Sequence, residues 1–374
     1  MFNRAKKILV LYISVGLGHK SLAENIGFWL EEQGYEVRLV DVLEAQKDNL
    51  GEVSVKIHLF INRHLPWVWR WLYNSTNTGL LSKFTLGLRT KLAGKHHQKF
   101  LNVLLGFNPD VVISTHATPS AVMAYLKQKN LYTGPLGIAF CDYHLHRYWL
   151  YHEADFYLAN LEGQKQQMVV LGIDPNKIFV CGIILKPKKE FDAKAIKLKL
   201  GIPQSNKVVM IACGSLGIGL NESVIKQAAS LNNVSVIVLC GKNLKMQEYL
   251  SNKYRNTNVL IFGYYVPLGE LFAITDFFLS KPGGMSIAEA LRWKISILIF
   301  YMLPGQEELN YKYLKDTGLV MPGSNDLANQ IKLEIESHNF HKSLLSNGEL
   351  DRLVPGPGRL IEAVAKFAES KLKP

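Results

Sequence analysis

The chain of 374 residues has little cysteine and no long apolar run. Its four cysteines, Cys141, Cys181, Cys213 and Cys240, are widely spaced and form no Cys-x-x-Cys pair. We therefore expect buried, reduced thiols and neither disulfides nor a metal site. No stretch approaches the ~20 consecutive apolar residues that a membrane-spanning helix needs, and Met1–Lys7 has no apolar core of a signal peptide. These absences predict a cytoplasmic protein that is either soluble or peripheral on a membrane.

Acidic residues are absent from residues 54–109, although this segment contains eight lysines and arginines and the whole chain carries a formal charge of +12. The segment also holds a dense aromatic and basic cluster, which comprises Arg63, Trp67, Trp69, Arg70 and Trp71. Tryptophan rings beside cations suit the surface of an anionic membrane. Single-stranded nucleic acid is a rival partner, because bases also stack on aromatic side chains. A helical insertion with tryptophans in the core is the third interpretation, but the acid-free composition of the whole segment favours the membrane.

Short apolar runs alternate with helix-like segments along the whole chain, which predicts parallel sheets covered by helices. The expected strands are residues 6–14, 35–42, 110–114, 135–140 and 178–180, then 207–213, 234–240, 259–262, 277–279 and 297–300. A polar, proline-containing segment, Lys186–Lys189, separates the two series. We predict an α/β fold with two Rossmann-like, doubly wound domains, residues 1–185 and 186–356, and a ligand site at the carboxyl ends of the strands.

The turn Pro282-Gly283-Gly284 joins an apolar strand to a helix that continues through Met285, Ser286 and Glu289. Glycines let the backbone approach a phosphate, and the helix amino terminus attracts it. Glu289 lies one and a half turns into the helix and could reach a ribose diol, or could be an ordinary exposed glutamate of the helix. An ordinary strand-to-helix turn would explain the same glycines.

Two further segments follow strands of the second half and would lie at the same edge. Gly214 and Ser215 open a glycine-rich turn that could contact phosphate, or could serve close helix–sheet packing. Gln306, Glu307 and Asn310 offer hydrogen-bonding groups that suit sugar hydroxyls, or a favourable acidic first turn of a helix.

The first strand ends in a turn with Gly16 and Gly18, and His19 follows at the start of a helix. A histidine there can act as general base toward a hydroxyl, since its unperturbed pKa lies near 6.5. The turn also matches half of a dinucleotide-binding fingerprint, with Asp41 at a suitable distance, but Ser21 occupies the third glycine position. NAD or FAD binding is therefore the less favoured interpretation.

Asp142-Tyr143-His144-Leu145-His146 follows another strand and has the His-x-His spacing of some metal sites. No third ligand is evident nearby, and Asp-x-Asp, a common divalent-metal motif in sugar-nucleotide chemistry, is absent from the chain. We assign Asp142 and His146 to acceptor positioning and expect no metal.

Taken together, these motifs resemble the processive diacylglycerol glucosyltransferases and the monogalactosyldiacylglycerol synthases, which are related to the glycosyltransferase MurG. The motifs that carry the resemblance are Asp142–His146 with Trp149, Cys240–Asn243, Phe262-Gly263-Tyr264, Lys281–Gly284 with Glu289, and Pro304–Glu307 with Asn310. The resemblance covers nearly the whole chain. One departure is Leu17, which stands between Gly16 and Gly18 where the family is often richer in glycine, so the acceptor is less secure than the donor.

The resemblance implies a GT-B fold and an inverting, metal-independent transfer of a hexose from UDP-glucose or UDP-galactose, without a cofactor. Gly283 and Gly284 would hold the diphosphate, Glu289 the ribose, and Gln306 and Glu307 the sugar. His19 would deprotonate the acceptor, diacylglycerol or a related lipid, on the inner face of the cell membrane. A last helix, about residues 359–372, would pack back on the first domain.

Two other enzymes share this pattern in part. A UDP-sugar 2-epimerase would use no lipid, and a MurG-like enzyme would use a polyprenyl-linked acceptor. A nucleic-acid-binding protein would leave the Pro282-Gly283-Gly284 and Gln306 motifs without a role, so we expect no nucleic acid.

Overall fold

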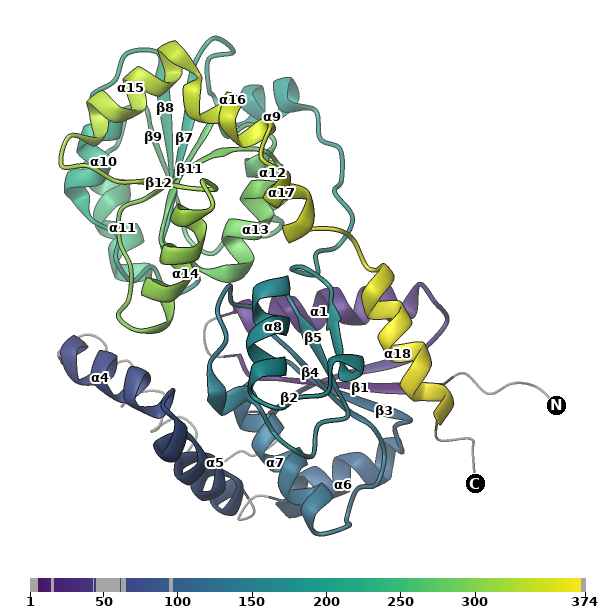
Figure 1. Ribbon diagram of the computed structural model, residues 1–374. Coiled ribbons are helices and arrows are strands. Elements are labelled where there is room, and N and C mark those ends of the chain that lie inside the picture. The colour runs from purple at the N-terminus through teal and green to yellow at the C-terminus, as the bar shows by residue number, and fades with distance from the viewer. Residues whose placement is uncertain are drawn as a thin grey trace. The chain divides into compact units, whose positions relative to one another are not determined.

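The protein is described by a computed structural model that covers residues 6–14, 17–42, 44, 61, 65–93 and 97–370 (Figure 1). Its contacts divide the chain into two compact units. The first unit comprises Met1–Lys186, Pro304–Gln306 and Leu353–Pro374, and the second comprises Pro187–Leu303 and Glu307–Arg352. Each unit contains one six-stranded sheet.

The sheet of the first unit is parallel, with the strand order β2-β1-β3-β4-β5-β6. Its strands are β1 (Lys7–Tyr12), β2 (Glu36–Asp41), β3 (Val111–Ser114), β4 (Leu136–Ala139), β5 (Phe156–Ala159) and β6 (Ile178–Val180). The helices around it are α1 (Gly18–Glu31), α4 (Pro66–Thr76), α5 (Gly79–Ala93), α6 (His97–Phe107), α7 (Ala117–Gln128), α8 (Glu162–Val170) and α18 (Gly358–Ser370), with the short 3-10 helices η2 (Arg147–Trp149) and η3 (Pro175–Lys177).

Helices cover both faces of this sheet, so its strands are apolar on both sides. Leu9 and Leu11 of β1 pack in a core cluster with residues of α6 and α7. The alternate residues Ile8 and Val10 are also fully buried and point to the opposite face, where α1 lies. The near-continuous apolar run of β1 thus follows from its central place in the sheet.

The second unit repeats this arrangement, with the strand order β12-β11-β10-β7-β8-β9. Its strands are β7 (Lys207–Ala212), β8 (Val234–Leu239), β9 (Val259–Phe262), β10 (Phe277–Ser280), β11 (Ser296–Ile299) and β12 (Met321–Pro322). Its helices are α9 (Ala193–Lys199), α10 (Glu222–Ala229), α11 (Leu244–Lys253), α12 (Leu268–Phe272), α13 (Gly284–Arg292), α14 (Gln306–Asp316), α15 (Leu327–Ser337), α16 (Asn339–Leu345) and α17 (Gly348–Leu353).

The predicted fold class is confirmed, because both units are parallel, helix-covered sheets. Two strands were not predicted. β5 is a four-residue run between irregular segments, and β12 has only two residues, one of them a proline. Helix α10 begins at Glu222, because the Asn221 side chain accepts a hydrogen bond from Ser223 N–H and caps the helix there.

The chain returns to the first unit at its end. Helix α18 contacts β6, β5, β3 and α1, and Phe367 stacks on Phe156 with ring centroids 4.7 Å apart. No helix in the described part of the chain is long and apolar enough to cross a membrane.

Candidate active site

In each unit, the polar and glycine-rich segments singled out from the sequence follow the carboxyl ends of parallel strands. In the first unit His19 comes after β1, Thr115 after β3, and Asp142 after β4. In the second unit Gly214 comes after β7, Cys240 after β8, Phe262 ends β9, and Gly283 comes after β10. Each sheet therefore presents its candidate residues at one edge, where ligands bind in open α/β sheets.

His19 is the best-defined side chain at the edge of the first sheet. Its Nδ1 lies 2.6 Å from the backbone oxygen of Thr115. A carbonyl oxygen only accepts hydrogen bonds, so Nδ1 carries the proton and donates it. In the neutral imidazole the lone pair is then on Nε2. The Thr115 hydroxyl also donates to the backbone oxygen of His19, at 3.1 Å, so that Thr115 fixes both the ring and the backbone.

The surroundings of His19 favour its neutral form. Burial lowers the pKa of His19, while Asp142 and the hydrogen bond to Thr115 partly oppose this effect. Two aromatic rings pack beside the imidazole: His116 at 4.6 Å and Trp149 at 5.9 Å between ring centroids. Cys141 contacts it as well, with Sγ 3.4 Å from Nδ1. Cys141 Sγ also lies 4.0 Å from Nε2. A neutral, oriented imidazole with its lone pair on Nε2 is the form that a general base requires.

Asp142 and His146 lie in one ordered segment, Asp142–Arg147, which we call the histidine loop. Asn160 and Gln164 each donate to the backbone oxygen of Asp142, at 2.9 and 2.8 Å. His146 is 1% exposed, and burial lowers its pKa to about 4.

Both ring nitrogens of His146 are engaged: Nε2 donates to the backbone oxygen of Tyr73 at 2.8 Å, and Nδ1 accepts from Tyr148 N–H at 3.3 Å. These bonds make His146 a structural anchor of the loop. No group of three or more His, Cys, Asp or Glu side chains suited to a metal ion occurs within the described ranges.

Helix α13 begins directly after the predicted diphosphate turn. Gly283 is its N-cap residue, Gly284 its first residue, and the first backbone bond runs from Ile287 N–H to Gly283 O. With nine residues, α13 carries a partial positive charge at this end. The Ser286 hydroxyl bonds back to Gly283 O at 3.3 Å, and Met285 is buried. This terminus has the polarity that an anionic ligand needs.

Lys281 and Glu307 form an ion pair next to this turn, with side chains that are 17% and 10% exposed. The other oxygen of Glu307 accepts from Leu303 N–H at 2.8 Å. The Lys281 side chain crosses toward the turn after β7: a Cβ on Gly214, which has a φ of +72°, would lie 3.0 Å from Lys281 Cε. Lys281 therefore brings a cation to the strand edge that carries Gly214 and Gly283.

Glu289 lies on α13, partly buried, five residues after the start of the helix. Its carboxylate accepts no hydrogen bond from any residue that the structure describes. Burial raises the pKa of Glu289 to about 7, although Arg292 opposes the rise. A carboxyl group with a strongly raised pKa beside such a turn is a candidate for a functional site.

The remaining predicted donor residues take different positions. Asn310 is 1% exposed and donates to the backbone oxygen of Pro282 at 3.1 Å, so it stabilises the conformation of the turn. Ser215 accepts from Lys242 N–H through its backbone oxygen at 2.8 Å. Phe262 and Gly263 are partly buried, whereas Tyr264 is 55% exposed. Gln306 begins α14 and is counted with the first unit.

Of the other predicted residues, Gly16 and Arg63 lie outside the described residues, and Gly18 is the first residue of α1. Trp67, Trp69, Arg70 and Trp71 all lie on α4. Trp67 and Trp71 are 67% and 63% exposed, and Arg70 is exposed beside them. The core interpretation is thus wrong for these two tryptophans. Trp69 is partly buried and packs on Tyr73, with ring centroids 6.2 Å apart.

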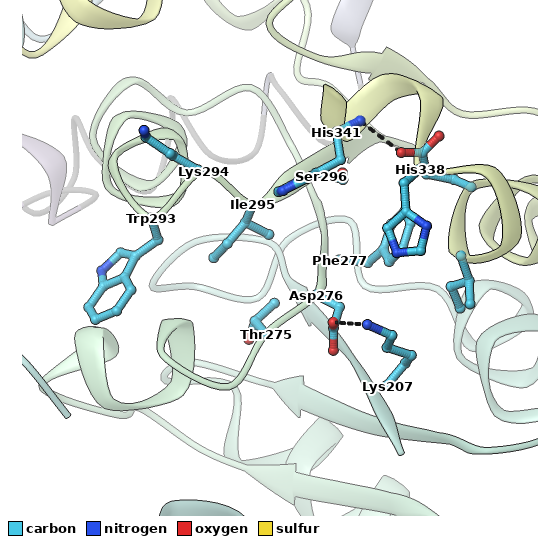
Figure 2. A pocket seen from close by; sticks show the side chains of 12 residues that line it. Lys207, Thr275, Asp276, Phe277, Trp293, Lys294, Ile295, Ser296, His338 and His341 are labelled. Atoms are coloured by element: carbon cyan, nitrogen blue, oxygen red, sulfur yellow. Dashed lines mark hydrogen bonds and ion pairs between the residues drawn. The ribbon is translucent and has the colours of Figure 1, made fainter. Parts of the chain in front are cut away.

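A pocket of about 210 Å³ lies at the opposite edge of the second sheet (Figure 2). Lys207, Phe277 and Ser296, each the first residue of its strand, line it together with His338 and His341. Lys207 donates to Asp276 at 2.8 Å within it. Because the donor candidates follow the carboxyl ends of these same strands, this pocket is separate from the candidate site.

Three contributors were missed by sequence reasoning. Thr115 orients His19 through its backbone oxygen, which no residue pattern reveals. Tyr73 contacts the histidine loop from a distant helix. Lys281 was noted only as part of a motif, although a lysine directly before a phosphate-type turn is a readable signal.

Two family models match the chain in succession. Residues 19–185 match monogalactosyldiacylglycerol (MGDG) synthase, and residues 208–331 match the glycosyltransferase family 28 C-terminal domain. The first match begins at His19 and covers the histidine loop. The second covers Gly214, Glu289 and Asn310.

Curated relatives align over most of the chain. A processive diacylglycerol beta-glucosyltransferase of Bacillus pumilus is 26% identical over 353 residues, which is 92% of this chain and 91% of that protein. An enzyme of the same name from Staphylococcus aureus is 27% identical over 334 residues, covering 85% of this chain and 81% of that protein.

Solved structures with the same fold include MurG of Acinetobacter baumannii, with a TM-score of 0.59 at 14% identity over 97% of this chain and 99% of that one. UDP-GlcNAc 2-epimerase of Neisseria meningitidis gives a TM-score of 0.63 at 16% identity, covering 96% and 100%. These likenesses concern the fold alone, which transferases and epimerases share. The sequence matches favour the transferases: the chain is a glycosyltransferase with the GT-B fold, and it is similar over most of its length to the monogalactosyldiacylglycerol synthases and processive diacylglycerol glucosyltransferases.

Proposed function

We propose that the protein transfers a hexose from UDP-glucose or UDP-galactose to the free hydroxyl of diacylglycerol, with inversion and without a metal ion or cofactor. The product is a monoglycosyldiacylglycerol. The observation that carries the proposal is the orientation of His19, whose Nδ1–H is held by Thr115 O and whose Nε2 is left as proton acceptor. The names of the sequence relatives support diacylglycerol as the acceptor.

His19 acts as the general base in this reaction. Its Nε2 takes the proton from the acceptor hydroxyl, whose oxygen attacks the anomeric carbon from the face opposite the diphosphate. The bond from the anomeric carbon to the phosphate oxygen breaks, and its electron pair leaves with UDP. The proton resides on His19, where Asp142 favours the resulting imidazolium.

The second unit binds the donor and receives the departing charge. The amino terminus of α13 and the ammonium of Lys281 stabilise the negative charge that builds on the diphosphate. Glu289 accepts hydrogen bonds from the ribose hydroxyls. Glu307 holds Lys281 in place. The ion pair between the two side chains supports this role for Glu307 better than direct binding of the sugar.

Helix α4 binds the membrane that contains the acceptor. Trp67 and Trp71 lie four residues apart on one face of α4, and Arg70 lies beside them. Phe84 and Leu88, a second pair of this spacing on α5, are 72% and 47% exposed. Exposed aromatic rings with cations fit the headgroup region of an anionic membrane. The protein would then be peripheral on the inner face of the cell membrane.

Sedimentation with vesicles tests the membrane contact. We expect binding to vesicles that contain anionic lipid, and weaker binding as salt rises, since each cation near the surface contributes about 1 kcal/mol. Equal binding to neutral vesicles would contradict this part of the proposal.

The donor and acceptor are tested together by incubating the protein with each UDP-hexose and vesicles that contain diacylglycerol, followed by mass spectrometry of the lipid extract. We expect a lipid heavier by one hexose. Epimerised UDP-sugar without a lipid product, or transfer only to a polyprenyl-linked acceptor, would overturn the proposal.

A further inference from the structure

Helix α4 has two faces with different partners. Trp67 and Trp71 point to solvent, whereas Trp69 and Tyr73, also four residues apart, lie on the opposite side. Tyr73 is 4% exposed, the one buried residue of this helix. The buried face of α4, with Trp69 and Tyr73, therefore contacts the rest of the first unit.

Tyr73 makes two hydrogen bonds with the histidine loop. Its hydroxyl lies 2.7 Å from Nε2 of His144, within hydrogen-bonding distance, and burial raises the pKa of Tyr73 well above 10, so the phenol keeps its proton. Its backbone oxygen accepts from Nε2 of His146 at 2.8 Å. The rings of Tyr73 and His146 also pack together, with centroids 4.3 Å apart. One residue of α4 thus binds both histidines of the loop.

Two neighbouring contacts strengthen this connection. Asn77, the C-cap residue of α4, accepts from Arg147 N–H at 2.9 Å. Arg89 of α5 lies over the ring of Tyr148, 4.8 Å from its centroid. The segment from Asp142 to Tyr148 is therefore attached to the α4–α5 pair at several points.

The two residues that flank this segment, Cys141 and Trp149, contact the proposed base. Cys141 Sγ lies 3.4 Å from Nδ1 of His19, and the ring of Trp149 lies 5.9 Å from the imidazole. Asp142 raises the pKa of His19 against the effect of burial. A continuous series of contacts leads from Tyr73 through the histidine loop to His19, entirely within the first unit.

We infer that Tyr73 is a positioning residue that couples membrane binding by α4 to the geometry of the base and its acceptor site. The inference rests on the proposed function, because it assumes that α4 meets the membrane and that His19 acts on the lipid. When Trp67 and Trp71 enter the membrane, α4 takes a fixed position, and Tyr73 imposes the matching position on the histidine loop. The enzyme is then most active when the acceptor lies in a bilayer.

Amide hydrogen exchange of the full-length protein, with and without anionic vesicles, tests the coupling directly. In the wild type, vesicles should slow exchange of the peptide that covers residues 142–149. Tyr73→Phe removes the hydroxyl bond to His144 and keeps the ring and the backbone oxygen. It should bind vesicles as well as the wild type, yet lose most of the slowing.

His144→Ala breaks the same bond from the other side and should give the same result. A thermal unfolding scan checks that both variants fold. Tyr35→Phe, at the tyrosine directly before β2, is the matched control and should behave as the wild type.

Activity gives a second readout that a purely structural role would not move. For Tyr73→Phe we expect kcat on vesicle-embedded diacylglycerol to fall about fivefold, as for the loss of one hydrogen bond. Its kcat on a dispersed short-chain diacylglycerol should stay within about twofold of the wild type.

Unchanged exchange at residues 142–149 on vesicle binding, full slowing in Tyr73→Phe, or a wild type that does not bind vesicles would each overturn the coupling. If glycolipid forms while the coupling fails, only this inference is wrong. If the loop responds to vesicles but no glycolipid forms, the proposed function is wrong.

Discussion

We predict that Glu289 lowers the stability of the protein without bound donor. The residue is kept because its carboxylate binds the donor. The ordinary pKa of 4.5 is raised to about 7 by burial on α13, and the carboxylate has no hydrogen bond within the described residues. Between these two values the folded state holds a proton that the unfolded state releases, so stability falls as pH rises from 4.5 to 7. Above pH 7 the loss is complete, about 3 kcal/mol at about 1.4 kcal/mol per pH unit.

Glu289→Gln removes this titration and keeps the size of the side chain. The variant should match the wild type near pH 4.5 and exceed it above pH 7, by up to about 3 kcal/mol. The same change should weaken UDP binding about tenfold, because a neutral amide oxygen accepts the ribose hydroxyls less strongly than a carboxylate does. Higher stability with weaker binding is the pattern expected of a residue kept for function.

The assay is thermal unfolding at pH 5 to 8.5, with and without UDP, together with calorimetric titration of UDP. The transition that shifts with UDP reports on the second unit. Glu336→Gln, an exposed helical glutamate on α15, is the control and should change neither quantity. If Glu289→Gln is no more stable than the wild type at pH 8, or binds UDP equally well, the assignment of Glu289 to the ribose is wrong.

Three further changes test the other parts of the site. His19→Ala should lower kcat by about 10²- to 10⁴-fold and leave UDP binding nearly intact. In the wild type, kcat should stay constant as the pH falls to below 6.5, because burial lowers the pKa of His19. Unchanged turnover in the variant would exclude His19 as the base. A loss of kcat that begins above pH 6.5 as the pH falls would exclude it too.

Glu307→Gln should destabilise the second unit by about 3 kcal/mol in denaturant, because Lys281 loses its partner in a mostly buried ion pair; a loss below about 0.5 kcal/mol, as at an exposed pair, would contradict this. The double variant Trp67→Ala/Trp71→Ala should lose anionic vesicle binding and keep its unfolding temperature, since both side chains are exposed; undiminished binding would place the membrane contact elsewhere.

Much of the fold is predictable from the sequence because both sheets are buried on two faces. Such strands are short apolar runs, and the glycine turns after Tyr12 and Ala212 mark where they end. β5 and β12 were not predicted, because strands of four and two residues are too short for a recognisable hydrophobic pattern. Their positions are set by pairing with β4 and β11.

Site residues could be predicted where the residue type itself indicates the chemistry. They could be predicted less well where tertiary packing sets the orientation or protonation of a side chain. His19, Gly283 and Glu289 follow strands and could be named from the sequence. The tautomer of His19 depends on the backbone oxygen of Thr115, which lies 96 positions away in the sequence. Tyr73 and His146 meet across 73 positions for the same reason, so no local pattern shows that His146 anchors a loop.

The most direct test of the central proposal is the anomeric configuration of the lipid product. The wild type is incubated with UDP-glucose or UDP-galactose, diacylglycerol vesicles and excess EDTA, and the purified glycolipid is analysed by proton NMR. We predict a β-linked hexosyldiacylglycerol from one of the two donors at an undiminished rate, and at least a hundredfold less from His19→Ala, as expected for loss of a general base. An α-linked product, loss of activity in EDTA, or no lipid product from either UDP-hexose would contradict the proposal.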